Sequence, residues 1–190
     1  MRCLIDNYIA AGDIRQLGGF QSFTLLDFIL ERRGDLTGGD PRRREGAAVA
    51  IENNLRRKAA EYAGPNPKYF QDMSVILEET VARRERNALD YARQLERYME
   101  LERMISRPEE GGRYPEPVRG SAAMRALYDN TGGNADLAVS LHTAVLSSKM
   151  DRFRGDPIKE RRIKGELLKL LKSRDEVERI FQIVVNQEEY

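Results

Sequence analysis

Cysteine and histidine are almost absent from this sequence. Cys3 is the single cysteine in 190 residues, and one thiol can form neither a disulfide framework nor a zinc site made of several cysteines. Such a composition is typical of proteins that work in a reducing cytosol. His142 is the only histidine. Because no second histidine or cysteine could join it as a ligand or nucleophile, we interpret it as a packed or surface residue.

Long hydrophobic runs are also missing. No stretch of the sequence approaches the ~20 continuous apolar residues that a membrane-spanning helix requires. Residues 1–7 lack an apolar run of the length found in signal peptides. We therefore expect a cytoplasmic protein that has no membrane partner.

Neither sign of charge is in excess. Lysine and arginine number 32, and aspartate and glutamate number 31, so no overall basic field attracts nucleic acid. Any contact with DNA would have to come from a local patch. Charged residues make up 33% of the chain and hydrophobic residues 41%, which suits solvated helices with one apolar stripe each better than a thick α/β core.

Sequence patterns for catalysis are lacking as well. No Gly-x-x-x-x-Gly-Lys-Ser/Thr loop occurs that could bind the phosphates of ATP. A nuclease site needs clustered carboxylates and a lysine to hold Mg²⁺ and a water. Asp156, Lys159 and Glu166 resemble that pattern, but such combinations arise by chance at this charge density. We expect no catalytic residue, metal site or bound cofactor in this chain.

Helical spacing is what the sequence does contain. Apolar residues recur at helical intervals, whereas the alternation of a strand is almost absent. Nothing breaks the helical pattern between Pro67 and Ile105, which predicts one helix roughly 55 Å long. Arg84 and Asn87 interrupt its apolar seam, which indicates either a kink or exposure to solvent. The other expected helices cover 2–11, 24–33, 45–62, 121–131, 134–147, 157–172 and 174–187.

A segment rich in proline and glycine divides this pattern. Residues 108–120 contain three prolines and three glycines and therefore predict a linker of low helical content. We predict an all-α fold, a helical bundle with one very long helix that the linker separates into two subdomains. The first subdomain would span 1–107 and include the long helix, and the second would span 121–190.

The run 149–164 is locally basic. Seven basic and three acidic residues give it a net charge of +4, and Gly155 permits an unusual backbone turn in it. One interpretation is a loop and helix N-terminus that contact phosphates. The other is a solvated helix face on which Glu160 and Lys164 pair. The candidate residues for contacts with DNA or a partner are Arg152, Phe153, Arg154, Lys159, Arg161, Arg162 and Lys164.

Within this run the side chains should differ in exposure. Phe153 should pack inward, whereas four cations should face solvent: Arg152, Arg154, Lys159 and Arg162. Two further candidates, Arg56 and Arg57, lie on the polar side of the predicted helix 45–62. With the cluster at 83–86 they could form one basic patch, although most such clusters are ordinary solvated helix surface.

Five blocks of this chain, taken in order, resemble one protein domain. They are 19–26 (GFQSFTLL), 51–58 (IENNLRRK), 66–70 (NPKYF), 126–130 (ALYDN) and the closing run from 159–164 (KERRIK) to 188–190 (EEY). Together they resemble the C-terminal helical domain of the R (motor and endonuclease) subunit of type I restriction enzymes. That family often has Trp before Arg-Gly, where this chain has Phe153. The phenyl ring keeps an aromatic anchor but removes the indole hydrogen-bond donor.

The resemblance implies a role in DNA restriction. The R subunit of that family is an ATP-dependent site-specific deoxyribonuclease that cuts DNA with a nuclease domain and moves it with two helicase-type lobes. The motifs of those domains lie outside the matching blocks, so ATP and Mg²⁺ would be bound elsewhere and no catalytic residue is transferred. The domain would dock the motor onto the methyltransferase core of modification and specificity subunits. The alternative is a helical module that binds DNA weakly through the basic run 149–164.

Overall fold

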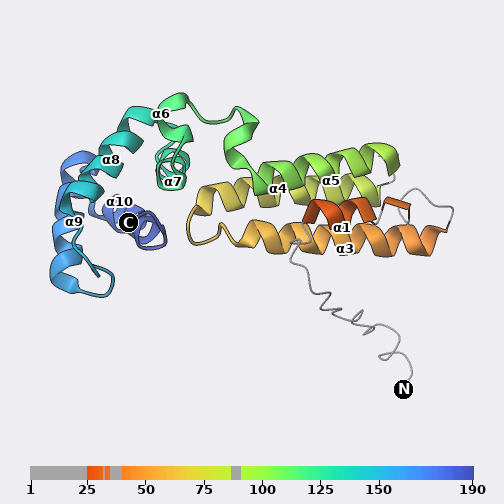
Figure 1. Cartoon of the computed structure of the whole chain (residues 1–190), viewed down its shortest axis with the longest axis horizontal. Coiled ribbons are helices and arrows are strands. Elements are labelled where there is room, and N and C mark those ends of the chain that lie inside the picture. Colours follow the sequence, from red (N-terminus) through yellow and green to blue (C-terminus); the bar gives the residue numbers. More distant parts are fainter. Residues whose placement is uncertain (1–24, 32, 35–39, 87–90) are drawn as a thin grey trace, which may run out of the picture.

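The computed structural model describes residues 25–31, 33–34, 40–86 and 91–190, and these form an all-helical protein without strands (Figure 1). The predicted all-α fold class is therefore confirmed. The helix expected at 2–11 lies outside the described residues. Among the residues described, no helix is both long and apolar enough to cross a membrane.

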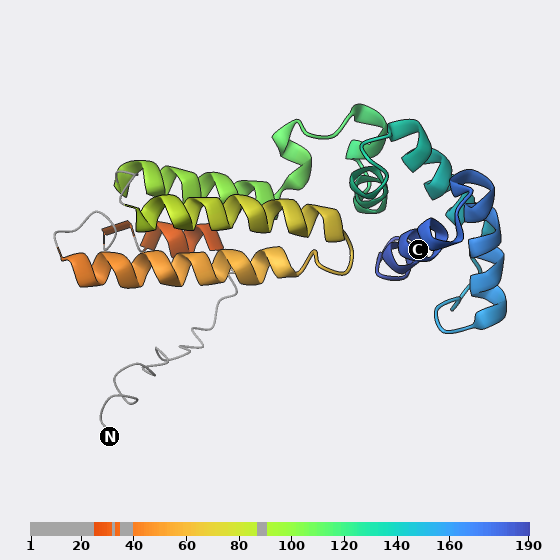
Figure 2. The same ribbon diagram turned by 180° about the vertical axis from the view of Figure 1, so that it is seen from behind.

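The N-terminal part consists of helices that lie side by side along the long axis of the molecule (Figures 1 and 2). They are α1 (Leu25–Glu31), α3 (Pro41–Ala60), α4 (Pro67–Glu85) and α5 (Tyr91–Ser106). Their inward faces share one apolar core. Its fully buried members include Ile29, Ile51, Leu55, Met73, Leu77, Tyr98, Leu101 and Ile105.

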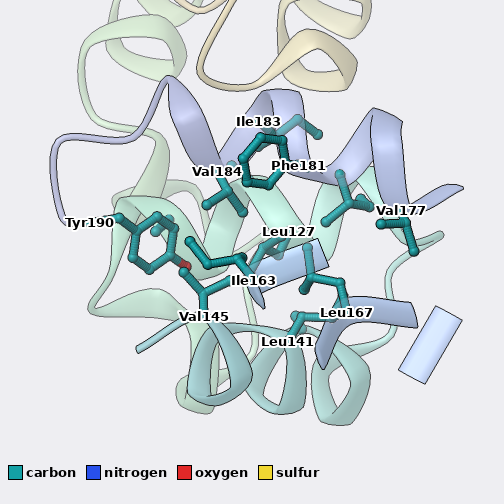
Figure 3. Close-up of a cluster of buried hydrophobic side chains, with 14 of the residues drawn as sticks. Leu127, Leu141, Val145, Ile163, Leu167, Val177, Phe181, Ile183, Val184 and Tyr190 are labelled. Carbon is teal, nitrogen blue, oxygen red and sulfur yellow. The ribbon is translucent and has the colours of Figure 1, made fainter. Parts of the chain in front are cut away.

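The C-terminal part is built from shorter helices around a second core (Figure 3). It contains the 3₁₀ turn η1 (Pro108–Gly111) and the helices α6 (Glu116–Arg119), α7 (Ala122–Asn130), α8 (Ala135–Ser148), α9 (Pro157–Leu171) and α10 (Arg174–Val185). The last helix buries an apolar stripe made of Val177, Ile180, Phe181 and Val184. Figure 3 shows it facing Leu127, Leu141 and Ile163.

The prediction of one very long helix is wrong. Helix α4 ends at Glu85, and the backbone of Arg86 leaves the helical region. The next residue that the structure describes, Tyr91, belongs to α5. Helix α5 then runs back along α4 (Figure 1). Each half carries its own apolar face, and a straight rod would leave both faces exposed to water. Folding back buries them against α3 in a single core, which outweighs the continuous helical spacing of the sequence.

The predicted helix starts are largely correct because side-chain caps mark them. Asn66 accepts a hydrogen bond from the Tyr69 N–H (3.2 Å) and precedes Pro67 at the first helical position. The same arrangement was missed at Asp40, which accepts from the Arg42 N–H (3.0 Å) before Pro41. Helix α3 therefore begins at Pro41, so residues 41–44, which precede the predicted helix 45–62, belong to it.

Two separate buried clusters match the two parts of the chain. The first contains residues from Ile29 to Ile105 and the second residues from Tyr114 to Tyr190. Within the expected linker, Tyr114 and Val118 are fully buried in the second cluster, so its C-terminal half packs as part of that core. The division into subdomains 1–107 and 121–190 stays a prediction.

Candidate functional site

A buried polar joint connects the two parts at the start of α4 and the end of α7. Asn66 donates from Nδ2 to Asp129 Oδ2 (2.8 Å), across 63 residues of sequence. Asn130 donates from Nδ2 to Asn66 Oδ1 (2.9 Å). The Asp129 side chain is only 1% exposed. A buried carboxylate needs several donors to offset its lost hydration, and the joint supplies them.

Two neighbouring side chains complete the set of donors around Asp129. The Tyr114 hydroxyl donates to Asp129 Oδ2 (2.7 Å), and Arg113 donates to Asp129 Oδ1 (3.2 Å). Arg113 also donates to Asp72 Oδ2 (2.6 Å) on α4. Burial acts to raise the pKa of Asp72, but the hydrogen bonds from Lys68 and Arg113 outweigh it and the pKa is lowered. Burial and the bond to Asp129 raise the pKa of Tyr114 above its ordinary value.

The C-terminal residues fasten the joint from the other side. Gln187 donates from Nε2 to the Pro65 carbonyl (2.6 Å) in the turn before α4. Glu189 accepts from the Ser121 hydroxyl (2.5 Å) and from the Ala123 N–H (3.1 Å) at the start of α7. Burial acts to raise the pKa of Glu189, but these hydrogen bonds lower it overall. The tail therefore ties α10 to both parts of the molecule.

The joint brings together two of the blocks that carry the resemblance. Block 66–70 supplies Asn66 and block 126–130 supplies Asp129 and Asn130. Glu189 of block 188–190 binds the opposite end of α7, at Ser121 and Ala123. None of these residues was a predicted site residue. Asparagine, aspartate and glutamate are common at helix ends, and the sequence gives no sign that these distant positions meet.

A second buried polar network lies inside the N-terminal core and was also missed. Arg84 on α4 donates from Nε to Glu52 Oε1 on α3 (2.9 Å), and the Tyr98 hydroxyl on α5 donates to the same oxygen (2.6 Å). Arg84 also binds Glu45 (2.7 Å). Burial and the bond to Glu52 raise the pKa of Tyr98. Arg84, interpreted from sequence as an interruption of the seam, thus links α3 to α4.

In the basic run 149–164, Phe153 is buried and Arg154 forms hydrogen bonds within the chain. Phe153 is 2% exposed and packs edge-on against Phe181, with 6.4 Å between ring centroids, so its inward packing is confirmed. Arg154 donates to three backbone carbonyls at the end of the chain, those of Val185 (2.7 Å), Gln187 (2.5 Å) and Tyr190 (3.3 Å). The side chain is exposed, as predicted, but its guanidinium donors are engaged within the chain.

Most of the other candidate cations are also engaged within the chain. Lys159 donates to the Asp151 carbonyl (2.9 Å), and Lys164 donates to Glu178 (2.7 Å) and lies over the Phe181 ring. Arg56 pairs with Glu78 (3.0 Å), and Arg57 donates to Asn54 (2.8 Å).

Arg152, Arg161 and Arg162 differ from these. All three are exposed, and within the described part of the chain only Arg162 has a polar contact, to the Met150 sulfur (3.8 Å).

The N-terminus of α9 already holds a carboxylate. Asp156 accepts from the Ile158 N–H (3.0 Å) and the Lys159 N–H (3.3 Å), and Glu160 accepts from the Gly155 N–H (2.8 Å). Asp156 therefore caps the helix, and Glu160 binds the backbone of the residue before the cap. A phosphate at this helix end would have to displace Asp156, so the cap disfavours the phosphate-binding interpretation.

The remaining titratable candidates are structural. His142 Nδ1 lies 2.7 Å from the Tyr190 hydroxyl and the two rings pack together, which confirms the packed interpretation. Burial lowers the pKa of His142. Glu166 pairs with Lys169 (2.7 Å) rather than with Asp156 and Lys159. Across the described ranges, no group of three or more His, Cys, Asp or Glu side chains is arranged to hold a metal ion.

An open pocket of about 660 Å³ lies beside the end of α5 and is lined by Tyr62, Met99 and Glu102 among others. Its charges are matched internally. Glu102 accepts from Ser106 (2.7 Å), and Arg103 and Arg107 both pair with Glu110 (3.6 and 3.2 Å). Because the rim carries both signs of charge in paired form, the pocket selects no particular ligand chemistry.

No family model, curated protein or solved structure gives a match to this chain.

Proposed function

We propose that this chain is the non-catalytic C-terminal helical domain of a type I restriction R subunit. In this role it docks the ATP-dependent DNA motor and nuclease onto the methyltransferase core of modification and specificity subunits. It contributes no residue to ATP hydrolysis or DNA cleavage. The proposal rests on the ordered resemblance blocks together with the way in which the chain uses them.

The observation that carries the proposal is the meeting of two blocks in one joint. Asn66 and Asp129 lie 63 positions apart along the chain, and Glu189 of a third block binds the start of α7, the helix that carries Asp129. A chance resemblance would have no reason to place Asn66 and Asp129 within hydrogen-bond reach of each other. The joint holds the two helical parts in one relative orientation. This fits a docking domain, which must hold its binding surfaces in a fixed orientation.

The engaged cations favour docking over DNA binding. Nonspecific DNA affinity comes from Lys and Arg side chains that are free to replace counterions on phosphates. Arg154, Lys159 and Lys164 already bind carbonyls or carboxylates of this chain. Few of the candidate cations remain exposed and free, too few for the multiple phosphate contacts that strong DNA binding needs.

Co-purification tests the proposal directly. The chain is mixed with the type I modification and specificity subunits of the same source, treated with nuclease and run on size exclusion. We expect a stable complex that survives the nuclease. If the chain elutes alone at micromolar concentrations, the docking function is wrong.

The second candidate, weak DNA binding, rests on the exposed side chains of Arg152, Arg161 and Arg162. Titration of a labelled duplex at several salt concentrations measures it. Substituting alanine for one arginine that binds a phosphate should lower the slope of log affinity against log salt by about one. A slope near zero for the unaltered chain would remove this candidate.

A further inference from the structure

The outer face of α9 is exposed along its whole length. We define this face as Ile158, Arg161, Arg162, Gly165, Leu168 and Lys169, which recur at three- and four-residue intervals and so share one side of the helix. All six are exposed. The opposite side holds Ile163 and Leu167, which are fully buried in the second core. Helix α9 therefore packs one face against the second core and leaves the other face exposed.

Apolar side chains on this face are unusually accessible for a solvated surface. Ile158 is 81% exposed and Leu168 is 39% exposed. Met150, just after α8, is 45% exposed, and the Arg162 guanidinium lies 3.8 Å from its sulfur. The α9 outer face thus continues onto Met150, and clustered exposed apolar residues indicate an interaction site.

The charge on the outer face has one sign. Arg161, Arg162 and Lys169 lie on it and no acidic residue does. Glu166 neutralises Lys169 from the flank at 2.7 Å, which leaves Arg161 and Arg162 as the dominant charges. Arginine beside exposed apolar anchors is the composition of protein interface hot spots.

Gly165 in the middle of this face has no internal explanation. A glycine inside a helix costs about 1 kcal/mol relative to alanine. Its φ is not in the left-handed region, and a Cβ built there would meet nothing within 4 Å. Nothing in the described chain needs the missing side chain. A glycine flanked by anchors permits the backbone of a second helix to approach closely.

We propose that the α9 outer face binds an acidic amphipathic helix of a partner protein. Carboxylates of that helix pair with Arg161 and Arg162, its apolar residues cover Ile158 and Leu168, and its backbone crosses at Gly165. The inference deepens the docking function proposed above by naming its surface and the chemistry of its partner. Residues 158–169 extend over roughly 16 Å, enough for about three turns of a bound helix.

Nucleic acid fits this face less well than a helix does. Ile158 and Leu168 would be placed against a phosphate backbone that offers them no apolar contact. The adjacent helix N-terminus, often an anion site, is closed by Asp156. DNA binding through this face is therefore an outcome of the test that would count against the inference.

The first test uses a labelled synthetic helical peptide with leucines three or four residues apart and flanking glutamates, and the same peptide with glutamine for glutamate. Anisotropy with the full chain should show binding of the first peptide and weaker binding of the second. Ile158→Ser and Arg161→Glu should each reduce affinity by about tenfold, as hot-spot losses do. Arg152→Glu, an equal charge change outside the face, is the control and should leave affinity within about twofold.

Gly165→Gln separates a docking role from a structural one. Glutamine is the better helix former and has room here, so the melting temperature should hold or rise while peptide affinity falls. Equal peptide affinity in Gly165→Gln and the unaltered chain would overturn the proposed crossing point. Failure of the acidic peptide to bind, or tighter binding of a DNA duplex that Arg161→Glu weakens, would overturn the inference as a whole.

The same variants, mixed with the modification and specificity subunits, distinguish this inference from the proposed function. A chain that assembles equally well with and without Arg161→Glu retains the docking function but docks elsewhere. A chain that binds the peptide through α9 yet never joins those subunits has the predicted surface and a different partner.

Discussion

At the scale of single residues, the same side-chain chemistry has opposite meanings in this chain. Arg154 and Arg161 both belong to the basic run. Arg154 donates hydrogen bonds to three carbonyls at the chain end, whereas Arg161 is exposed and makes no polar contact among the described residues. The carbonyls that bind Arg154 lie in the last turn of α10 and just beyond it, where helices leave acceptors without intrahelical partners. Backbone acceptors have no sequence signature, so this difference could not be predicted from the pattern of charges.

Replacing Arg154 should therefore lower stability. Arg154→Ala leaves the carbonyls of Val185 and Gln187 without their charged donor, and bonds to charged groups contribute about 1.5–3 kcal/mol each at most. We expect a loss of about 1–3 kcal/mol in the free energy of unfolding, measured by urea denaturation. Arg152→Ala is the matched control and should change it by less than about 0.5 kcal/mol. Equal stability of the two variants would return Arg154 to the set of free cations.

Glu189 should make stability depend on acid pH. Its folded-state pKa lies below the ordinary value of 4.5 because Ser121 and the α7 backbone donate to its charged form. The stabilisation is therefore fully present above pH 4.5 and is lost as pH falls through the folded pKa. The melting temperature of Glu189→Gln should lie below that of the unaltered chain at pH 6–7, and the gap should narrow below about pH 4.5. A gap that is constant with pH contradicts the proposed capping role.

At the scale of elements, the spacing of apolar residues predicted the helices but not where the chain turns. The starts of α4, α7 and α8 were predicted to within a residue, because a short polar side chain (Asn66, Ser121 or Asn134) precedes each amphipathic run and caps it. Between Glu85 and Tyr91, the end of α4 and the start of α5, the sequence has no proline or glycine. Only burial of both faces against α3, a non-local effect, decides the hairpin.

The Glu52–Arg84 pair should be a sensitive point of that three-helix packing. Glu52 is 2% exposed, and its removal leaves Arg84 without its buried partner in a mostly buried position. We expect Glu52→Leu to destabilise by about 3 kcal/mol, the lower end for breaking a buried pair, because exposed Glu45 still binds Arg84.

The double variant Glu52→Leu/Arg84→Met should recover part of that loss, since it leaves no buried charge without a partner. A double-mutant cycle from urea unfolding measures the coupling. Strictly additive losses would mean that the two side chains stabilise the fold independently.

At the scale of the whole molecule, two apolar cores are joined mainly by polar contacts. The cores divide between Ile105 and Tyr114, and the contacts across the joint are hydrogen bonds of Asn66, Asp129 and Gln187. Hydrogen bonds have a preferred geometry, so this joint fixes the relative orientation of the two parts while burying little apolar surface. The sequence predicted the division from the prolines and glycines of 108–120, but it could not predict partners 63 residues apart.

The final prediction is that this joint couples the unfolding of the two parts. Asp129→Ala removes the acceptor shared by Asn66, Tyr114 and Arg113 and leaves their donors unsatisfied in a buried site. Each core should persist, because neither apolar cluster includes Asp129. Amide hydrogen exchange measures the free energy of opening for each group of helices. This free energy should be the same for α3–α5 and α8–α10 in the unaltered chain and should differ between them in the variant.

The control is Asp136→Ala, on the exposed first turn of α8, which should leave the two free energies of opening equal. Matched protection in Asp129→Ala as well would mean that packing between α4 and α7, rather than the polar joint, holds the molecule together.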